Sequence, residues 1–235
     1  MESLWTNTDF PFQLIICDDA SNAETQEYIF DLVRAGKVST ALFNTGHNMG
    51  IGIAFNRGAA IARGKWLFKL DADLIYEPQW LSQAIDLLSN QVIGCLGLFK
   101  YWHEPCHFDH ELIVDQGTYF EVQDFVGSAI GMRREVYDQF GPWSEQGHAF
   151  AEDVLYKRAV QVGGLCMALP KEDLVENFGF GANRSALIRK ADWVGGNHEY
   201  NIPNTEPSLF GPGIESQVRE ENRENLDLLA VERCL

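Results

Sequence analysis

The fold of this chain is indicated first by the stretch KWLFKLDAD, residues 65–73. Residues 65–70 are mostly apolar and predict a buried strand. Asp71, Ala72 and Asp73 follow at the end of that strand. Two carboxylates separated by one residue suit a hard divalent cation, because such ions take oxygen ligands. The same pattern also fits two turn or capping aspartates, so the surrounding sequence must decide between them.

A second apolar stretch, FQLIIC (residues 12–17), lies upstream and ends at Asp18 and Asp19. Residues 38–43 (VSTALF) predict another strand, and a Gly- and Asn-rich stretch then leads into a small-residue helix over 53–62. Strand, helix, strand, helix, strand is the order of a parallel sheet covered by helices, and ligands of such sheets gather beyond the carboxyl ends of the strands. We therefore expect one rim to hold Asp18, Asp19, Asn48, Asp71 and Asp73.

The helix between the first two strands is predicted over residues 24–34 (ETQEYIFDLVR). Ser21 or Asn22 can cap it, because a side-chain oxygen there satisfies a free backbone amide. Helical periodicity predicts that its inward side chains are Tyr28, Ile29, Leu32 and Val33.

The second half of the chain predicts helices over 78–88, near 134–140 and over 150–162, and strands over 92–101 and 124–132. The apolar side of the helix at 150–162 is expected to carry Val154, Leu155, Ala159 and Val162. The remaining expectations are a loop or hairpin at 102–119, a loop or lid at 177–212 and a terminal helix at 215–229.

Composition excludes several classes of protein. The chain has 235 residues, 46% of them hydrophobic, and a formal net charge of −16. This acidity argues against a broad nucleic-acid or anionic-membrane surface, which needs clustered Lys and Arg. No apolar run is long enough for a membrane span and no signal peptide is visible, so we expect a cytoplasmic protein. The odd number of cysteines and their wide spacing predict reduced thiols: Cys17, Cys95, Cys106, Cys166 and Cys234.

Four motifs occur in order along the chain: the Asp18-Asp19 pair, N-x-G-x-x-x-A-x-N-x-G over 48–58, A-x-G over 62–64, and the Leu-Asp-Ala-Asp of 70–73. With this order, residues 12–82 resemble the nucleotide-sugar-binding half of the inverting glycosyltransferases of family two. FQLIICDDASNAET is particularly similar to the spore-coat-type bacterial members. The later GSAIGMRREVYDQFGPWSE and AEDVLYKRA are similar to the acceptor half of the family.

The resemblance implies a GT-A fold, in which a mixed, mostly parallel α/β sheet is flanked by helices in a single domain. It divides the chain into a nucleotide-sugar-binding half at 1–100, an acceptor-binding half at 101–176, and a C-terminal loop or lid and helix at 177–235. It also implies transfer of a hexose from a nucleotide-sugar, expected to be a UDP-sugar, to an acceptor hydroxyl with inversion, and a requirement for Mn2+ or Mg2+.

Site residues follow from the same resemblance. Asp19 would contact the base beside Asp18, with Asn48 and Gly50 near the nucleotide. The diphosphate or ribose and the metal would be held by Asp71, Ala72 and Asp73. Glu152 and Asp153 follow as the catalytic pair, and we expect Asp153 to be the general base, because inversion needs a carboxylate to accept the acceptor proton. An exposed, acidic first turn of a helix is the alternative for that pair.

Other metal ligands stay open. Many metal-dependent relatives have a histidine ligand where this chain has Asn177, and the nearest downstream candidate is His198. The cluster His103, Cys106, His107 and His110 has spacings that zinc accepts, although we expect it to border the acceptor pocket. Trp102, Trp143 and Trp193 are either sugar-stacking or core residues.

The chain departs from the family pattern at its beginning. Family members start with a strand and loop that form one wall of the base pocket, and residues 2–8 (ESLWTNT) resemble the end of the helix that follows them. An uncovered sheet edge would result, and a homodimer is one way to cover it.

Two other functions compete with glycosyl transfer. A nucleotidyltransferase would use acids and a metal, but it usually carries a basic, Gly-rich phosphate loop that is not found near the first strand. A noncatalytic nucleotide-sugar or glycan-binding module would retain the fold without the chemistry. The acceptor stays open between a glycan, a lipid-linked sugar, a protein, a small molecule and a modified nucleobase.

Overall fold

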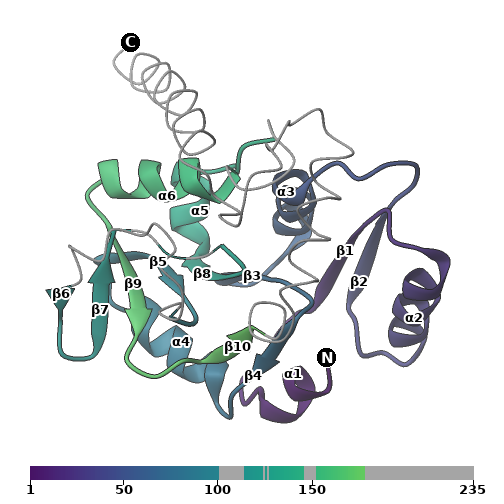
Figure 1. The fold of residues 1–235 in the computed structure, drawn as a ribbon, viewed down its shortest axis with the longest axis horizontal. Coiled ribbons are helices and arrows are strands. Elements are labelled where there is room, and N and C mark those ends of the chain that lie inside the picture. The colour runs from purple at the N-terminus through teal and green to yellow at the C-terminus, as the bar shows by residue number, and fades with distance from the viewer. Residues whose placement is uncertain (101–113, 124, 126, 146–151, 178–235) are drawn as a thin grey trace, which may run out of the picture.

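The computed structural model describes residues 1–100, 114–123, 125, 127–145 and 152–177 (Figure 1). The helices are α1 (Glu2–Asn7), α2 (Ala23–Arg34), α3 (Ile51–Ile61), α4 (Trp80–Leu88), α5 (Arg134–Phe140) and α6 (Glu152–Val162). The strands are β1 (Ile15–Asp19), β2 (Thr40–Asn44), β3 (Trp66–Leu70), β4 (Leu74–Tyr76), β5 (Ile93–Gly97), β6 (Val114–Asp115), β7 (Tyr119–Val122), β8 (Ala129–Arg133), β9 (Cys166–Pro170) and β10 (Val175–Asn177).

The described strands form three sheets. The largest has six strands in the order β3-β8-β5-β9-β7-β6, while β1 pairs with β2 and β10 pairs with β4. In Figure 1 the six-stranded sheet occupies the centre, and β1, β2 and α2 lie together at one side of it. The predicted α/β fold with helices around a mixed sheet is confirmed.

Strand direction differs from the expectation of a mostly parallel sheet. In the six-stranded sheet, β5 and β9 are parallel, whereas β3–β8, β8–β5, β9–β7 and β7–β6 are antiparallel. The expected parallel sheet of the first three strands was also wrong, because β3 pairs with β8 and is not hydrogen-bonded to β1 or β2. Periodicity identifies a strand but says little about its neighbours, and here the later strand β8 takes the place beside β3.

Helices cover both faces of the six-stranded sheet. On one face, α4 contributes Trp80, Ala84 and Leu88 to a core with Ile93 and Leu96 of β5. On the other face, a second core joins α5 and α6 to the sheet through Val136, Phe140, Tyr156, Val160, Cys95 and Met132. Figure 1 shows α4 on the opposite side of the sheet from α5 and α6. The two faces explain why β5 and β8 are buried at every residue.

Two buried or half-buried arginines connect the layers. The guanidinium of Arg133 donates to the carbonyl oxygens of Leu88, Asn90, Gln91 and Ile93, which form the connection from α4 to β5. Arg134 donates to the carbonyls of Ala59, Ala62 and Gly64 at the end of α3. Cations there satisfy carbonyls that a helix end leaves without partners.

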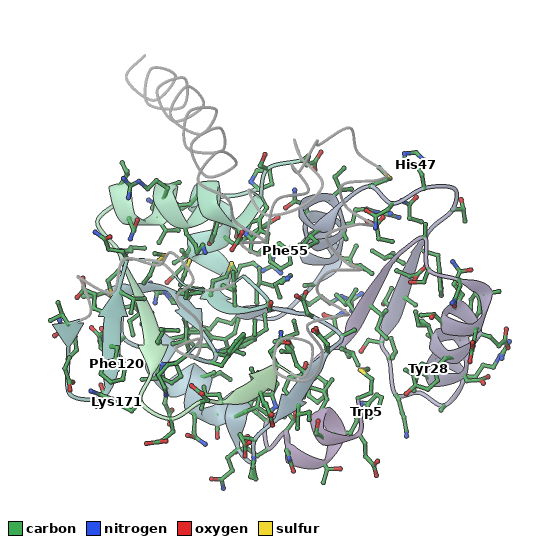
Figure 2. All side chains as sticks on the ribbon, viewed as in Figure 1. Trp5, Tyr28, His47, Phe55, Phe120 and Lys171 are labelled. Carbon is green, nitrogen blue, oxygen red and sulfur yellow. The ribbon has the colours of Figure 1, made fainter. Side chains whose placement is uncertain are left out.

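Helix α2 buries fewer residues than its periodicity predicts. Ile29 and Leu32 are buried, but Tyr28 is 51% exposed and Val33 is 39% exposed, so the inward orientation expected for these two was wrong. Figure 2 shows Tyr28 on α2, at the side of the molecule. Among the described elements the helix packs mainly against β2, so a narrow apolar stripe suffices to cover the contact. Asn22 caps the helix by accepting a hydrogen bond from the Thr25 amide.

Most predicted elements occur, with shifted ends. The first strand begins at Ile15 rather than at residue 12, and β5 ends at Gly97 rather than at residue 101. Residues 114–122 form the antiparallel hairpin of β6 and β7, while residues 102–113 of the predicted loop or hairpin lie outside the described residues. Val162 at the end of α6 is 77% exposed, so its expected inward orientation was wrong. The helix and lid predicted within 178–235 lie outside the described residues.

No helix in the described part of the chain has the length and hydropathy to cross a membrane. The three described cysteines, Cys17, Cys95 and Cys166, form no disulfide with one another.

Candidate active site

The Asp71-Ala72-Asp73 turn connects β3 to the short strand β4. The backbone amide of Asp71 donates to the carbonyl of Ser128 at 2.9 Å, which fixes the turn to the segment before β8. Ala72 is exposed at the tip, while Asp71 and Asp73 are half-buried. The turn therefore presents its two carboxylates from a fixed backbone.

The two carboxylates have different environments. Asp71 Oδ1 accepts a hydrogen bond of 2.6 Å from the ammonium of Lys69, a residue of β3 whose side chain is 9% exposed. Asp73 Oδ1 is buried and has no hydrogen-bond donor among the residues that the structure describes. A buried carboxylate oxygen without a donor is costly, and a cation at this oxygen would offset that cost.

The pKa of Tyr76, the last residue of β4, responds to the negative charge of this turn. Burial raises the pKa of the Tyr76 hydroxyl well above its usual range, and the negative charges of Asp71 and Asp73 raise it further. The phenol consequently stays protonated beside the two acids.

Asn177 lies at the same end of this region. Strand β10 is antiparallel to β4, and its register pairs Asn177 with Leu74, the residue that follows Asp73. Asn177 is buried. Within the described ranges no three His, Cys, Asp or Glu side chains are grouped closely enough to hold a metal ion. His198 lies outside the described residues, so the fit of a cation rests on the oxygens of Asp71, Asp73 and Asn177 together with those of a ligand.

Asp153, the predicted general base, is buried in the first turn of α6 and is 6% exposed. Its Oδ2 lies 3.0 Å from the ammonium of Lys157, one turn later on the same helix. That ammonium also donates to the carbonyl of Phe125 at 2.6 Å. The alternative of an exposed acidic first turn is therefore wrong for Asp153, whereas the side chain of Glu152 lies outside the description.

Gly127 brings the two acidic regions together. Its carbonyl accepts a hydrogen bond of 2.9 Å from Lys69, the partner of Asp71. A Cβ atom added to Gly127 would lie 2.3 Å from Asp153 Oδ2, so the glycine backbone is in direct contact with the carboxyl group. Asp153, and the lysine that pairs with Asp71, thus both contact Gly127.

Asp19 belongs to a separate cluster at the start of α3. Its carboxylate accepts hydrogen bonds from the Asn44 side chain and from the backbone amides of Met49 and Gly50 at 2.8–3.1 Å. Asn48 donates to the Asp19 carbonyl at 3.4 Å and accepts from the Gly50 amide at 3.0 Å. Gly50 has a φ of 98°, a conformation that favours glycine, which explains this residue at the N-cap of α3. Asp19 therefore orders the loop between β2 and α3.

Asp18 is buried and points to the other side of β1. Its Oδ2 accepts hydrogen bonds from the Ser21 amide at 3.3 Å and from the Gln26 side chain at 3.0 Å, so it orders the turn into α2. No hydrogen bond or ion pair between described residues joins Asp18 or Asp19 to the Asp71 turn. Asp18 and Asp19 are thus held by their own hydrogen bonds, separately from the Asp71 turn.

Sequence reasoning missed three residues of the site: Lys69, Lys157 and Gly127. Two signals were present, because Lys69 interrupts the apolar run of β3 two residues before Asp71, and Lys157 follows Asp153 by one helical turn. The contact of Gly127 with Asp153 spans 26 positions of sequence and carries no local signal.

Two other predicted features have different outcomes. Trp143 is 1% exposed and packs against Phe55 and Tyr156, so it is a core residue and not a sugar-stacking surface. Figure 2 shows Phe55 projecting from α3 toward this core. The His103, Cys106, His107 and His110 cluster, together with Trp102 and Trp193, lies outside the described residues.

Solved structures share this fold. A mannosyltransferase from Pyrobaculum calidifontis, solved with GDP-mannose and Mn2+, superposes with a TM-score of 0.63 at 19% identity over 98% of this chain and 68% of its own. S. aureus TarS 1-349 gives a TM-score of 0.57, and its complex with UDP-GlcNAc gives 0.56, each at 16% identity over 87% of this chain. GalNAc-T7, solved with UDP, GalNAc and Mn2+, gives 0.53 at 16% identity over 67% of this chain.

This chain spans 36% of the GalNAc-T7 chain and 61% of the TarS chain. No curated protein sequence matches it. The model of the family described as "Glycosyl transferase family 2" matches residues 1–141, which is more than half of the chain and includes the clusters around Asp19 and Asp71. The sequence order of motifs, the GT-A architecture and this match agree, and the chain belongs to glycosyltransferase family 2.

Proposed function

We propose that this chain transfers a sugar from a nucleotide-sugar, with UDP as the nucleotide, to an acceptor hydroxyl with inversion, and that the reaction requires Mn2+ or Mg2+. The observation that carries the proposal is the buried Asp73 Oδ1, which lacks a donor and lies in the same turn as Asp71. The solved structures with UDP, UDP-GlcNAc or GDP-mannose, two of them with Mn2+, support this class of donor.

The donor side of the site would consist of both ordered clusters. Asp73 would bind the cation, with Asn177 beside it as a further oxygen ligand, and Asp71 would face the ribose or diphosphate. A divalent cation there would supply positive charge to the departing diphosphate. Asp18, Asn48 and Gly50 would line the nucleotide, and Asp19, whose carboxylate already accepts four hydrogen bonds, would hold the loop that contacts it.

Asp153 would act on the acceptor side. Its carboxylate accepts the proton of the acceptor hydroxyl while the hydroxyl oxygen bonds to the anomeric carbon and the bond from that carbon to the diphosphate oxygen breaks. The nucleoside diphosphate leaves with the electron pair, and attack from the opposite face inverts the anomeric centre. Burial of Asp153 excludes water that would otherwise compete for the same proton.

A thermal-shift experiment tests donor and metal together. UDP with Mn2+ is expected to stabilise the chain by about 2.7 kcal/mol at 100 times Kd, and UDP without metal by much less. Asp73→Asn should abolish the metal-dependent part of the shift. Asp86→Asn, which removes an exposed carboxylate of α4, should leave that part unchanged.

Three outcomes separate the alternatives. A shift with GDP in place of UDP would change the donor assignment. A shift without sugar transfer or donor hydrolysis would identify a nucleotide-sugar-binding module. The absence of a shift with every nucleoside diphosphate, with or without Mn2+, would overturn the proposed function.

A further inference from the structure

The site contains two buried lysines that the proposed chemistry does not use. Lys69 lies in β3 and is 9% exposed, and Lys157 lies in α6 and is 3% exposed. A buried ammonium is costly unless it is paired and hydrogen-bonded, and a well-packed apolar side chain in the same place often gives equal or greater stability. The presence of two such groups therefore calls for a role in addition to packing.

Both ammonium groups make the same kind of contact. Lys69 Nζ lies 2.6 Å from Asp71 Oδ1 and 2.9 Å from the carbonyl oxygen of Gly127. Lys157 Nζ lies 3.0 Å from Asp153 Oδ2 and 2.6 Å from the carbonyl oxygen of Phe125. Each lysine thus bridges one carboxylate of the site to one backbone carbonyl, and the two carbonyls are two residues apart.

The segment between β7 and β8 is common to both bridges. We call it the Gly127 loop, and its described residues are Gln123, Phe125, Gly127 and Ser128. The carbonyl oxygen of Ser128 accepts a hydrogen bond from the backbone amide of Asp71, and the Gly127 backbone touches the carboxylate of Asp153. The Gly127 loop is therefore fixed to the donor-side acid by one lysine and to the acceptor-side acid by the other.

This arrangement fixes where the two carboxylates lie relative to each other. An ammonium that contacts both a carboxylate and a carbonyl limits the carboxylate to few orientations, because charge-assisted hydrogen bonds are short and strong. Orientation matters greatly for group transfer, and a displacement of about 1 Å can reduce the rate roughly 100-fold. The ammonium groups of Lys69 and Lys157 each hold one carboxylate and so oppose such a displacement of Asp71 or Asp153.

We propose that Lys69 and Lys157 are positioning residues, of which Lys69 orients Asp71 for the donor and Lys157 orients Asp153 for the acceptor, both against the Gly127 loop. The inference rests on the proposed function, since it gives these acids their donor-side and acceptor-side roles. The inference predicts that loss of each lysine changes a different kinetic parameter. If the lysines had a purely structural role, replacing either one would lower stability, and the folded proteins would have the same kcat and donor KM.

The test is a pair of substitutions, Lys157→Gln and Lys69→Gln, since glutamine can still reach a carbonyl but has no charge. Lys157→Gln is expected to lower kcat about 100-fold while the UDP and Mn2+ thermal shift stays within 1 °C of the wild-type shift. Lys69→Gln is expected to raise the donor KM about tenfold and to reduce that thermal shift, with a smaller change in kcat. Lys157→Arg, which keeps the charge, should recover at least tenfold in kcat over Lys157→Gln.

Matched controls are available on the same elements. Arg158→Gln removes the next cation of α6, and Lys65→Gln removes an exposed lysine just before β3; both should behave as wild type. Circular dichroism and the melting temperature without ligand identify the folded fraction of each variant. Gly127→Ala is an independent variant that leaves both lysines in place, and it should lower kcat because the new Cβ displaces the Asp153 carboxylate.

The inference is overturned if folded Lys157→Gln keeps kcat within twofold of wild type, or if folded Lys69→Gln keeps both the donor KM and the thermal shift. Its failure differs from that of the proposed function, because the wild-type chain would then still bind UDP with Mn2+ and transfer sugar. A wild-type chain without a nucleotide shift and without transfer would overturn both.

Discussion

Strands β1 and β5 have similar sequences but different surroundings. Both begin with an apolar stretch, with IICDD in β1 and IGCLG in β5, but β1 ends in two aspartates. Every residue of β5 is buried, whereas the three apolar residues of β1 are all partly exposed. β5 has strands on both edges and helices on both faces, while β1 pairs with β2 and packs against α3. An apolar sequence favours a strand, but the number of strands and helices packed around that strand determines how much the strand stabilises the fold.

The comparison divides the described part of the molecule into two regions that differ in burial and in expected contribution to stability. The six-stranded sheet with α4, α5 and α6 contains both hydrophobic cores and carries Asp153. The region of β1, β2 and α2 is less buried, and it holds Asp18 and Asp19 in place mainly through hydrogen bonds. We expect the first region to determine global stability and the second to respond locally to ligand binding.

Core truncations should show the largest difference between the regions. Leu96→Ala in β5 removes a fully buried side chain and is expected to cost about 2–5 kcal/mol of unfolding free energy. Ile16→Ala in β1 should cost no more than about half of that, because Ile16 is partly exposed and less transfer free energy is lost. Urea unfolding followed by circular dichroism measures both. An equal or larger loss for Ile16→Ala would contradict the proposed division.

Two adjacent arginines provide a second comparison. Arg133→Met leaves four carbonyls beside the buried end of α4 without their donor and should cost about 2–3 kcal/mol. Arg134→Met removes donors from the end of α3, where water can replace them, and should cost about 1 kcal/mol. The two variants differ by one position and have the same change in charge, so their unfolding free energies are directly comparable. A larger loss of unfolding free energy for Arg134→Met than for Arg133→Met would show that the contact of Arg134 with α3 stabilises the fold more.

The sequence was sufficient for local elements and for the donor motifs. Apolar runs that end in Asp or Asn predicted β1 and β3 within a few residues, and the Gly- and Asn-rich stretch before α3 predicted the loop that Asp19 organises. These features are local, since a strand, its terminal turn and a helix cap involve residues close in sequence. The order of the motifs then led to the family that the family model matches.

Long-range pairing was beyond the reach of the sequence. Pattern alone gave no reason for β8, rather than β1, to pair with β3 in antiparallel register. The wrong orientation of Tyr28 has the same origin, because helical periodicity cannot show that α2 packs mainly against β2 among the described elements. Lys69 and Lys157 were missed because a lysine in an apolar segment usually indicates an exposed face, and only tertiary structure places an acid beside each one.

Asp19→Asn tests whether the less buried region depends on hydrogen bonding. The amide keeps one acceptor oxygen in place of a charged carboxylate with four hydrogen bonds, so we expect a loss of about 1 kcal/mol in stability. Nucleotide affinity should fall about tenfold, because the loop before α3 is no longer fixed. Asp31→Asn, an exposed acid of α2, is the control. Unchanged UDP binding in Asp19→Asn would show that the loop before α3 does not contribute to nucleotide binding.

The smallest effect is a difference in thiol labelling that leaves stability unchanged. Cys17 in β1 is partly exposed, whereas Cys95 in β5 is completely buried. Burial raises the pKa of the Cys17 thiol, with Arg57 opposing the rise, so its thiolate fraction at pH 8 is below that of an ordinary exposed thiol. Iodoacetamide should therefore label Cys17 slowly at pH 8 and faster as the pH rises through the raised pKa of its thiol. Labelling of Cys95 should require opening of the six-stranded sheet. Peptide mass spectrometry resolves the two sites, and labelling of Cys95 as fast as Cys17 would show that the two regions open together.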